Sequence, residues 1–345
     1  MTWKPKTIAV YLLAGLIAVI ALAETAQAQG NLPGNKLTIQ VGYAPGGGND
    51  IYARLLAHYL PAYLPGKPTT VVENVPGAGS LTLANNMYVT APRDGTMIAT
   101  VAQTMPLNQL VGSPGIRFEA AKFNWIGRMS SSVQAMVFSS ALPVRSIDDL
   151  RTTEVVAAAS GPASGASLFP ILLNTVLGTK LKMVRGYTGV PDMMLAIERG
   201  EAGATSVTLT SLTGQYAPLL KAGKIVLLAQ NAIKRHPDIP NVPTTVELAR
   251  NDEERDTLKL FASVGDIGRA YLAPPGVPDA RVAQLRKAFM DSMKDPELVA
   301  YAQKNNLELD PMPGEELQKL IVDMSKVPES TIERAKVVIA ADSKG

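Results

Sequence analysis

Apolar residues recur with two different periods along this chain, and the two periods alternate. Near the N-terminus Leu37, Ile39 and Val41 lie on one face of a strand, and from Ile51 onward apolar residues return at helical spacing. The rhythm starts again near residue 133, and the chain closes with helical stretches. Alternation of strands and helices predicts an α/β fold with parallel strands and helices on both faces of the sheet.

Each change of period marks an expected element boundary. The expected strands lie at 36–44, 69–76, 96–103, 133–140, 154–160, 181–187 and 224–230. After the helix that begins at Ile51, the expected helices lie at 81–91, 168–178, 190–200, 279–293 and 314–324. Ser80 is a candidate N-cap for the helix at 81–91. The charged stretch 247–260 is best explained as a solvated helix or loop.

The first 28 residues have the pattern of a secretory signal peptide. Lys4 and Lys6 precede an uninterrupted apolar run over residues 8–23, and Ala26-Gln27-Ala28 gives the small-x-small pattern of a cleavage site. The run is shorter than the roughly 20 apolar residues that a spanning helix needs, although an uncleaved anchor is the alternative. We expect cleavage after Ala28, export, and a soluble mature chain.

Composition narrows the possible partners and chemistry. Removal of residues 1–28 takes away two lysines and one glutamate, so the formal net charge of +3 becomes +2. With no lysine-rich block either, neither nucleic acid nor an anionic membrane is indicated. The absence of cysteine excludes disulfides, thiol nucleophiles, zinc–thiolate sites and a lipoprotein anchor. The length predicts two domains, because one core rarely fills so many residues.

Two turns rich in small residues stand between an expected strand and an expected helix. The first is Pro45-Gly46-Gly47-Gly48, and the second runs from Gly161 to Ser167. Ligands bind at this place in an open parallel sheet, and the first N–H groups of a helix are unpaired and partially positive. Glycines let a ligand approach these donors, which predicts a backbone site for a carboxylate or phosphate. Asp50 would repel such a ligand, so its expected role is capping.

Other interpretations of these turns have weaker support. Each could be only a turn. The dinucleotide-binding fingerprint fails, because Gly46-x-Gly48 is followed by Ile51 where the third glycine belongs, and the similar Gly77-x-Gly79 is followed by Thr82. A phosphate-binding P-loop fails as well, since no Gly-Lys-Ser/Thr follows either turn.

Catalytic groups are few. Ser164 and Ser167 lack the second glycine of a nucleophile elbow, and only His58 and His236 could supply a general base. A metal site would need clustered carboxylates and histidines, and none is visible. We therefore expect no catalysis, no metal and no cofactor.

Several segments together resemble the solute receptors of tripartite tricarboxylate transporters, often called Bug receptors. That family has a Pro-Gly-Gly-Gly-x-Asp loop, a Val-Glu-Asn-x-Pro-Gly-Ala-Gly segment, an Asp-Gly before a strand and a late Ala-Pro-x-Gly-x-Pro segment. These motifs stand here at 45–50, 72–79, 94–95 and 273–278. The resemblance covers essentially all of the mature chain.

The resemblance implies a type II periplasmic binding protein fold, in which two α/β lobes close over a ligand cleft. Lobe one would comprise residues 29–127 and 270–345, and lobe two residues 128–269. The chain would cross between them near Arg128 and Ala270. The two glycine-rich turns would then face each other across the cleft.

The family motifs also imply ligand contacts, position by position. From lobe one these are Tyr43, Ala44, Pro45, Gly46, Gly47, Gly48, Asn49, Asp50, Ser80, Gln103 and Thr104. From lobe two they are Ser160, Gly161, Ser164, Gly165, Ala166, Ser167, Tyr187, Thr188, Gly189 and Thr208. Thr188 replaces a basic residue common in the family, and Thr210 is a further candidate beside Thr208.

The implied function is a periplasmic receptor for a small organic carboxylate, such as a di- or tricarboxylate or a related acid. It would present the ligand to the small and large membrane subunits of a permease, which would recognise the closed form. We expect a monomer. Two alternatives are a sensor-type binding protein that reports ligand to a signalling receptor, and a periplasmic hydrolase that uses Ser164 or Ser167.

Overall fold

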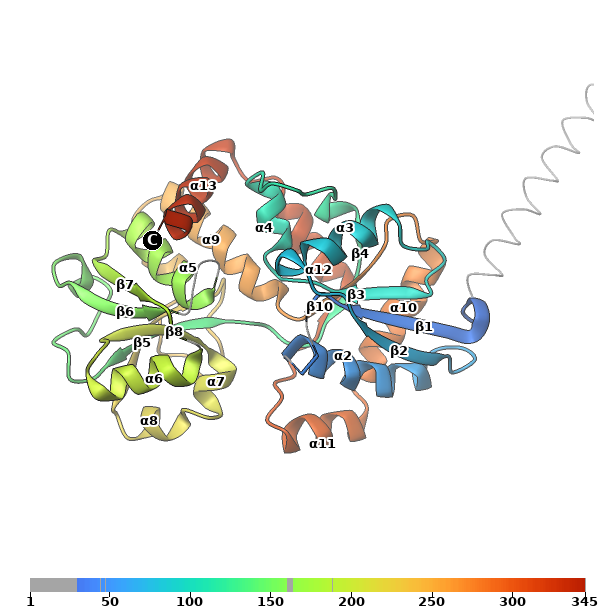
Figure 1. The fold of residues 1–345 in the computed structure, drawn as a ribbon, viewed down its shortest axis with the longest axis horizontal. Coiled ribbons are helices and arrows are strands. Elements are labelled where there is room, and N and C mark those ends of the chain that lie inside the picture. The colour runs from blue at the N-terminus through green and yellow to red at the C-terminus, as the bar shows by residue number, and fades with distance from the viewer. Residues whose placement is uncertain (1–29, 44, 47, 160–163, 188, 345) are drawn as a thin grey trace, which may run out of the picture.

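The computed structural model describes residues 30–43, 45–46, 48–159, 164–187 and 189–344, which form two β-sheets flanked by helices (Figure 1). The first sheet has the order β11-β4-β10-β3-β1-β2, and the second has the order β7-β6-β8-β5-β9. The first sheet consists of β1 (Lys36–Val41), β2 (Thr69–Asn74), β3 (Met97–Thr100), β4 (Asn124–Arg128), β10 (Ala270–Ala273) and β11 (Met312–Pro313). The second consists of β5 (Gln134–Ser139), β6 (Val155–Ala159), β7 (Leu181–Arg185), β8 (Ala204–Thr208) and β9 (Ile225–Asn231).

Helices cover both sheets. Beside the first sheet lie α2 (Gly48–Tyr59), α3 (Leu81–Val89), α4 (Met105–Leu110), α10 (Asp279–Ser292), α11 (Pro296–Lys304) and α12 (Gly314–Met324). Beside the second lie α5 (Gly165–Leu172), α6 (Val190–Arg199), α7 (Leu209–Thr213) and α8 (Ala217–Lys221). The two remaining long helices are α9 (Asp252–Ile267) and α13 (Glu329–Lys344). Within the described residues, no helix has both the length and the apolar character of a membrane span.

Strand direction differs in part from the parallel sheets that the sequence predicts. β1 is parallel to β2 and β3, and β6 is parallel to β7 and β8. In contrast, β10 is antiparallel to β3 and β4, and β5 is antiparallel to β8 and β9. The chain leaves the first sheet through β4 and returns through β10, so these two strands run in opposite directions and Ala270 pairs with Arg128. The lobe boundaries expected from the sequence stay predictions.

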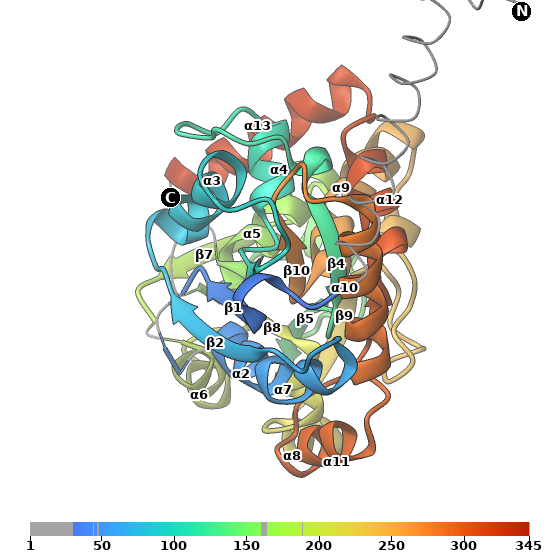
Figure 2. The same ribbon diagram turned by 90° about the vertical axis from the view of Figure 1, so that its right-hand side faces the viewer.

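Side chains pack on both faces of the first sheet. Successive side chains of a strand point to opposite sides, and all four residues of β10 are buried. In β10, Tyr271 packs with the side chains of α2 and α10, and its ring centroid lies 5.8 Å from that of Phe289. The next residue, Leu272, packs on the other face with α3 and α12. Figure 2 shows α2 and α3 on opposite sides of this sheet.

One hydrophobic core runs through both halves of the molecule. It joins Trp125 of β4 and Leu317 of α12 with Phe169 of α5, Phe261 of α9 and Val338 of α13. The last helix, α13, packs against α5 and α9 beside the second sheet (Figure 1). The two sheets are therefore connected by packed helices as well as by the crossover segments.

The charged segment 247–260, for which the sequence suggests a solvated helix or loop, contains the start of a helix with a buried face. α9 buries Leu258 and Phe261, because α4, α12 and α13 pack against it. Those partners come from distant parts of the chain, so the local sequence does not reveal them. Helix 314–324 and strand 181–185, by contrast, begin where the hydrophobic pattern predicts.

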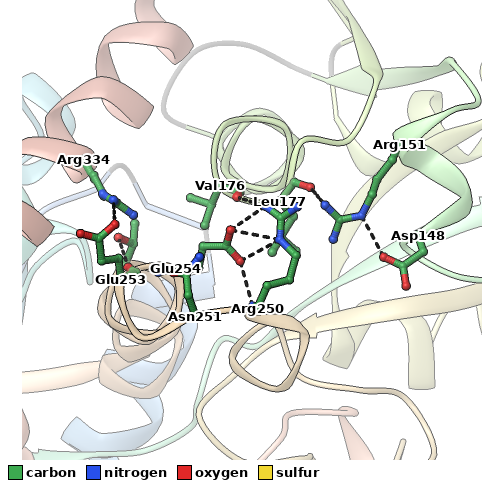
Figure 3. A network of polar contacts seen from close by, with 10 residues as sticks. Asp148, Arg151, Val176, Leu177, Arg250, Asn251, Glu253, Glu254 and Arg334 are labelled. Carbon is green, nitrogen blue, oxygen red and sulfur yellow. Dashed lines mark hydrogen bonds and ion pairs between the residues drawn. The ribbon is translucent and has the colours of Figure 1, made fainter.

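A network of polar contacts fixes the start of α9 (Figure 3). The Asn251 side chain accepts a hydrogen bond from the backbone N–H of Glu254 at 2.8 Å, which is an N-cap interaction. Arg250 forms an ion pair with Glu254 at 2.5 Å and lowers the pKa of that buried carboxyl. Arg334 of α13 pairs with Glu253. These charges thus have a structural role: they fix the start of α9 and attach it to the last helix.

Candidate functional site

A cavity of about 510 Å³ lies between the two halves of the molecule. Five residues predicted for the ligand site line it: Tyr43, Asn49, Gln103, Thr104 and Gly165. Residues that the sequence did not single out also line it, among them Ala78, Gly79, Ser132, Gln134 and Asn231. The cavity therefore collects segments from the ends of β1 and β3, from the turn before α3, from the crossover and from the start of α5.

The loop before α2 is held in place by Asp50. The Asp50 carboxylate accepts a hydrogen bond from the backbone N–H of Gly46 at 2.8 Å, where the backbone has a φ of +86°. Arg54 donates to both carboxylate oxygens at 2.9 Å, and Asn74 donates to Asp50 at 2.9 Å and to the carbonyl of Tyr43 at 2.9 Å. The Arg54 contact holds the pKa of Asp50 at about 2. Asp50 thus positions the loop and is not among the described residues that line the cavity.

The turn before α3 contains unusual backbone conformations. Gly77, Ala78, Gly79 and Ser80 all have positive φ values, of 150°, 46°, 61° and 81°. Positive φ at a residue other than glycine is uncommon and costs free energy, and such strained residues cluster at active sites and ligand-binding segments. Since Ala78 and Gly79 line the cavity, this strained turn forms one of its walls.

Ser80 is not the helix cap that the sequence suggests. Its side chain makes no capping hydrogen bond to α3, and among the described residues its buried Oγ has no hydrogen-bond partner. A Cβ at Gly42 would lie 1.8 Å from this oxygen, so Ser80 packs directly against the backbone at the end of β1. The left-handed backbone of Ser80 explains the failed prediction, since an N-cap usually has extended φ and ψ values.

The start of α5 is organised by two serines. The Ser164 side chain accepts a hydrogen bond from the backbone N–H of Ser167 at 3.2 Å, so Ser164 is the N-cap. Arg185, at the end of β7, donates to Ser167 Oγ from Nε at 3.2 Å and from Nη2 at 3.0 Å. The two candidate nucleophiles therefore have structural partners.

The two histidines that could supply a general base contact other residues. His236 Nε2 lies 3.4 Å from Glu308 Oε1, and the hydrogen bond to that carboxylate raises the pKa of His236. The His58 ring packs edge-on against Tyr59 at 4.7 Å between centroids. Among the residues that the structure describes, no group of three His, Cys, Asp or Glu is placed to hold a metal ion.

An arginine lies beside each of the two helix N-termini at the cavity. Arg185 contacts the first turn of α5 through Ser167. A Cβ at Gly48, the first residue of α2, would lie 3.5 Å from Arg269 Nη2. The Arg269 guanidinium also stacks 4.6 Å from the Tyr52 ring centroid and donates to Ser130 Oγ at 2.8 Å. A cation beside the positive end of a helix dipole is unfavourable alone, and an anion bound between them would relieve the repulsion.

The amide of Gln134 lies directly against the start of α5. A Cβ at Gly165 would be 2.8 Å from Gln134 Cδ, and Gln134 Oε1 accepts a hydrogen bond from Ser206 Oγ at 3.0 Å. β5 pairs with β9, which places Asn231 opposite Gln134. A polar residue at the end of each apolar strand run is the signal in the sequence that could have identified this pair.

None of the other predicted site residues that the structure describes lines the cavity. Asp50, Ser80, Ala166 and Ser167 are buried and Ser164 is half-buried, whereas Pro45, Gly46 and Gly48 are exposed at the loop. Tyr187, Gly189, Thr208 and Thr210 are not among the described lining residues, and Thr210 donates to Glu308 from the other half of the molecule. Ala44, Gly47, Ser160, Gly161 and Thr188 lie outside the described residues, as does the predicted signal peptide.

A group of ionisable residues that includes Arg128 and Asp266 lies on the opposite side of the crossover from the cavity. Ser132 and Gln134 face the cavity, whereas Ser131 and Val133 border a hollow that Arg128 and Asp266 also line. Burial raises the pKa of Asp266 to about 6. This carboxyl is therefore more easily protonated in the folded chain than in the unfolded chain.

Replacement of Asp266 by asparagine is expected to stabilise the protein in a pH-dependent way. The raised pKa means that the folded state binds more protons between about pH 4 and pH 6, so the wild type loses stability as the pH rises through this window. The gain from Asp266→Asn should thus be small at pH 4.5 and on the order of 2 kcal/mol at pH 7.5. Urea unfolding at both pH values measures it, and an equal gain at both would contradict the assignment.

Comparison with known proteins places the chain in a family. Residues 53–337 match the family model described as tripartite tricarboxylate transporter family receptor. A Cupriavidus necator protein described as "UPF0065 protein in gbd 5'region" is 28% identical over 334 residues, covering 93% of this chain and 94% of that protein.

Solved structures show the same fold. A TctC solute binding protein from Polaromonas has a TM-score of 0.68 at 19% identity, over 89% of this chain and 98% of that chain. MatC from Rhodopseudomonas palustris with bound malate has a TM-score of 0.55 at 20% identity, over 88% of this chain and 98% of that chain. These similarities confirm the expected periplasmic binding protein fold.

Proposed function

The chain belongs to the tripartite tricarboxylate transporter receptor family, and from this premise we propose that its cavity captures a small organic carboxylate. One observation carries the proposal: the starts of α2 and α5, one from each half of the molecule, adjoin the same cavity with an arginine beside each. Backbone N–H groups of the first helical turns, helix dipoles and guanidinium charges all favour an anion there. The family is one of receptors, which supports binding over the hydrolase alternative.

Different groups around the cavity have different roles in binding. Backbone N–H groups at the starts of α2 and α5 bind the carboxylate. The guanidinium groups of Arg185 and Arg269, which lie beside these helix starts, make the electrostatic potential there more positive. The amide groups of Asn49, Gln103 and Gln134 and the hydroxyl of Thr104 orient the rest of the ligand. Ala44, Gly47, Ser160, Gly161 and Thr188 belong to the proposal through the family motifs alone.

The wider role follows from the family. We propose that the mature protein works in the periplasm and delivers its ligand to the two membrane subunits of a permease. Binding closes the two halves around the ligand through the crossover segments, and the closed form is what the permease recognises. The related fold of MatC, which holds malate, supports a carboxylate as the class of ligand.

A thermal-shift screen of residues 29–345 tests the binding function. The ligands are mono-, di- and tricarboxylates, amino acids and phosphate esters, each at millimolar concentration. A ligand at one hundred times its dissociation constant should add about 2.7 kcal/mol of stability, so a selective rise in Tm with carboxylates is expected. A folded protein whose Tm no carboxylate changes, while a phosphate ester does, would contradict the proposal.

A further inference from the structure

The described lining of the cavity is uncharged, and the two guanidinium groups beside it stand at the helix starts. The described residues that line it include no Asp, Glu, Lys, Arg or His. The residues outside the described ranges, at 44, 47, 160–163 and 188, carry no ionisable side chain either. Both nearby guanidinium groups, those of Arg185 and Arg269, stand beside the helix starts. A second carboxylate, away from these helix starts, would therefore be buried without a positive partner, which is unfavourable.

The face of α5 that borders the cavity becomes apolar within one turn. Gly165, Leu168, Phe169 and Leu172 all line it. These positions are spaced by three, four and seven residues, so they share one face of the helix. At 1.5 Å per residue the apolar face extends about 10 Å from the helix start to Leu172. A ligand whose carboxylate binds at the start of α5 would thus lie along Leu168 with its remaining atoms.

Apolar side chains also approach from the other elements around the cavity. Val264 of α9 also lines the cavity, and Leu81, Met105 and Ile116 come from the first half of the molecule. Leu81, Ile116 and Leu168 are only half-buried, so they keep surface that a ligand can cover.

Asn108 and Ser113 line the cavity from the same segment as Met105 and Ile116, and their side chains are polar but uncharged. Away from the helix starts the described lining is therefore mainly apolar and carries no charge.

We infer that the preferred ligand is a monocarboxylate with an extended apolar or aromatic body, and not a di- or tricarboxylate. This inference rests on the proposed function, because it places the single carboxylate at the starts of α2 and α5. The apolar body would lie between Leu168 and Val264 on one side and Leu81 and Ile116 on the other. Removal of this apolar body from water would stabilise the complex in proportion to the apolar area that is buried.

Isothermal titration with acids of matched length tests the inference. Hexanoate and octanoate are compared with adipate and suberate, which differ by the second carboxylate. Octanoate should bind at least tenfold more tightly than suberate. It should also bind about 16-fold more tightly than hexanoate, since each of its two additional methylenes contributes about fourfold when buried. Adipate or suberate binding as tightly as the matching monoacid would overturn the inference and leave the proposed function intact, whereas no binding by any carboxylate would overturn both.

A charge placed among the apolar side chains away from the helix starts provides a second test. Ile116→Lys should reverse the preference, because the ammonium group would pair with the far carboxylate of suberate, whereas octanoate has no partner for it. Ile116→Met is the matched control, which should keep the preference for octanoate. If Ile116→Lys does not fold, Leu81→Lys places the charge on the same wall of the cavity. A folded lysine variant with an unchanged ratio of affinities would overturn the inference.

Discussion

Replacement of Gly165 by valine is expected to weaken carboxylate binding about a hundredfold. The added Cβ would lie 2.8 Å from Gln134 Cδ, so it would displace an amide that lines the cavity, and its methyl groups would cover the first N–H groups of α5. Loss of one or two hydrogen bonds to a charged group accounts for an effect of this size. Isothermal titration of the variant with the best carboxylate measures it.

The control for this prediction is the folding of the variant itself. Gly165 does not have a positive φ, so valine can adopt its backbone conformation, and the thermal unfolding of the ligand-free variant should stay close to that of the wild type. Gly165→Ala adds only the Cβ and should have an intermediate effect on affinity. Unchanged affinity in a folded valine variant would mean that the start of α5 does not bind the carboxylate.

Replacement of Asp50 by alanine is expected to destabilise the protein by about 2 to 3 kcal/mol, through loss of the buried hydrogen bonds that hold the loop before α2. The Asp50 side chain is 3% exposed, and Gly46, Arg54 and Asn74 all donate to it. Arg54→Ala is the matched control. It should cost less, because the Arg54 side chain is 51% exposed and the carboxylate keeps its other two donors.

The pH dependence of this effect has a defined sign. The folded pKa of Asp50, about 2, lies below that of the unfolded chain, so its contribution is complete above about pH 4 and is lost as the pH falls toward 2. Urea unfolding of wild type and Asp50→Ala at pH 7 and pH 3 measures the difference. A loss in Asp50→Ala no larger than in Arg54→Ala would show that only a surface ion pair had been removed.

Local patterns in the sequence predicted the elements but not their long-range partners. The strand at β1 and the helix at α12 follow from the spacing of their own apolar residues. The buried face of α9 could not be inferred in this way, because α4, α12 and α13 cover it from three other parts of the chain. The antiparallel β4–β10 pair likewise depends on the path of the chain between the two sheets.

The candidate site was predictable where backbone chemistry leaves a signal in the sequence. Glycines before α2 and α5 indicated the two helix starts, and the family resemblance is confirmed by the family model. Gln134, Asn231 and Val264 were missed, since each belongs to an ordinary strand or helix and meets the others only in the fold. The N-cap prediction for Ser80 was wrong, because its position before a helix does not show that its backbone is left-handed.

A crystal structure of the protein with its best-binding carboxylate tests the central claim most directly. The account predicts that the carboxylate oxygens lie within about 3 Å of backbone N–H groups at the starts of both α2 and α5, with the rest of the ligand inside the cavity. A carboxylate bound elsewhere, or held by only one of the two helix starts, would contradict the account.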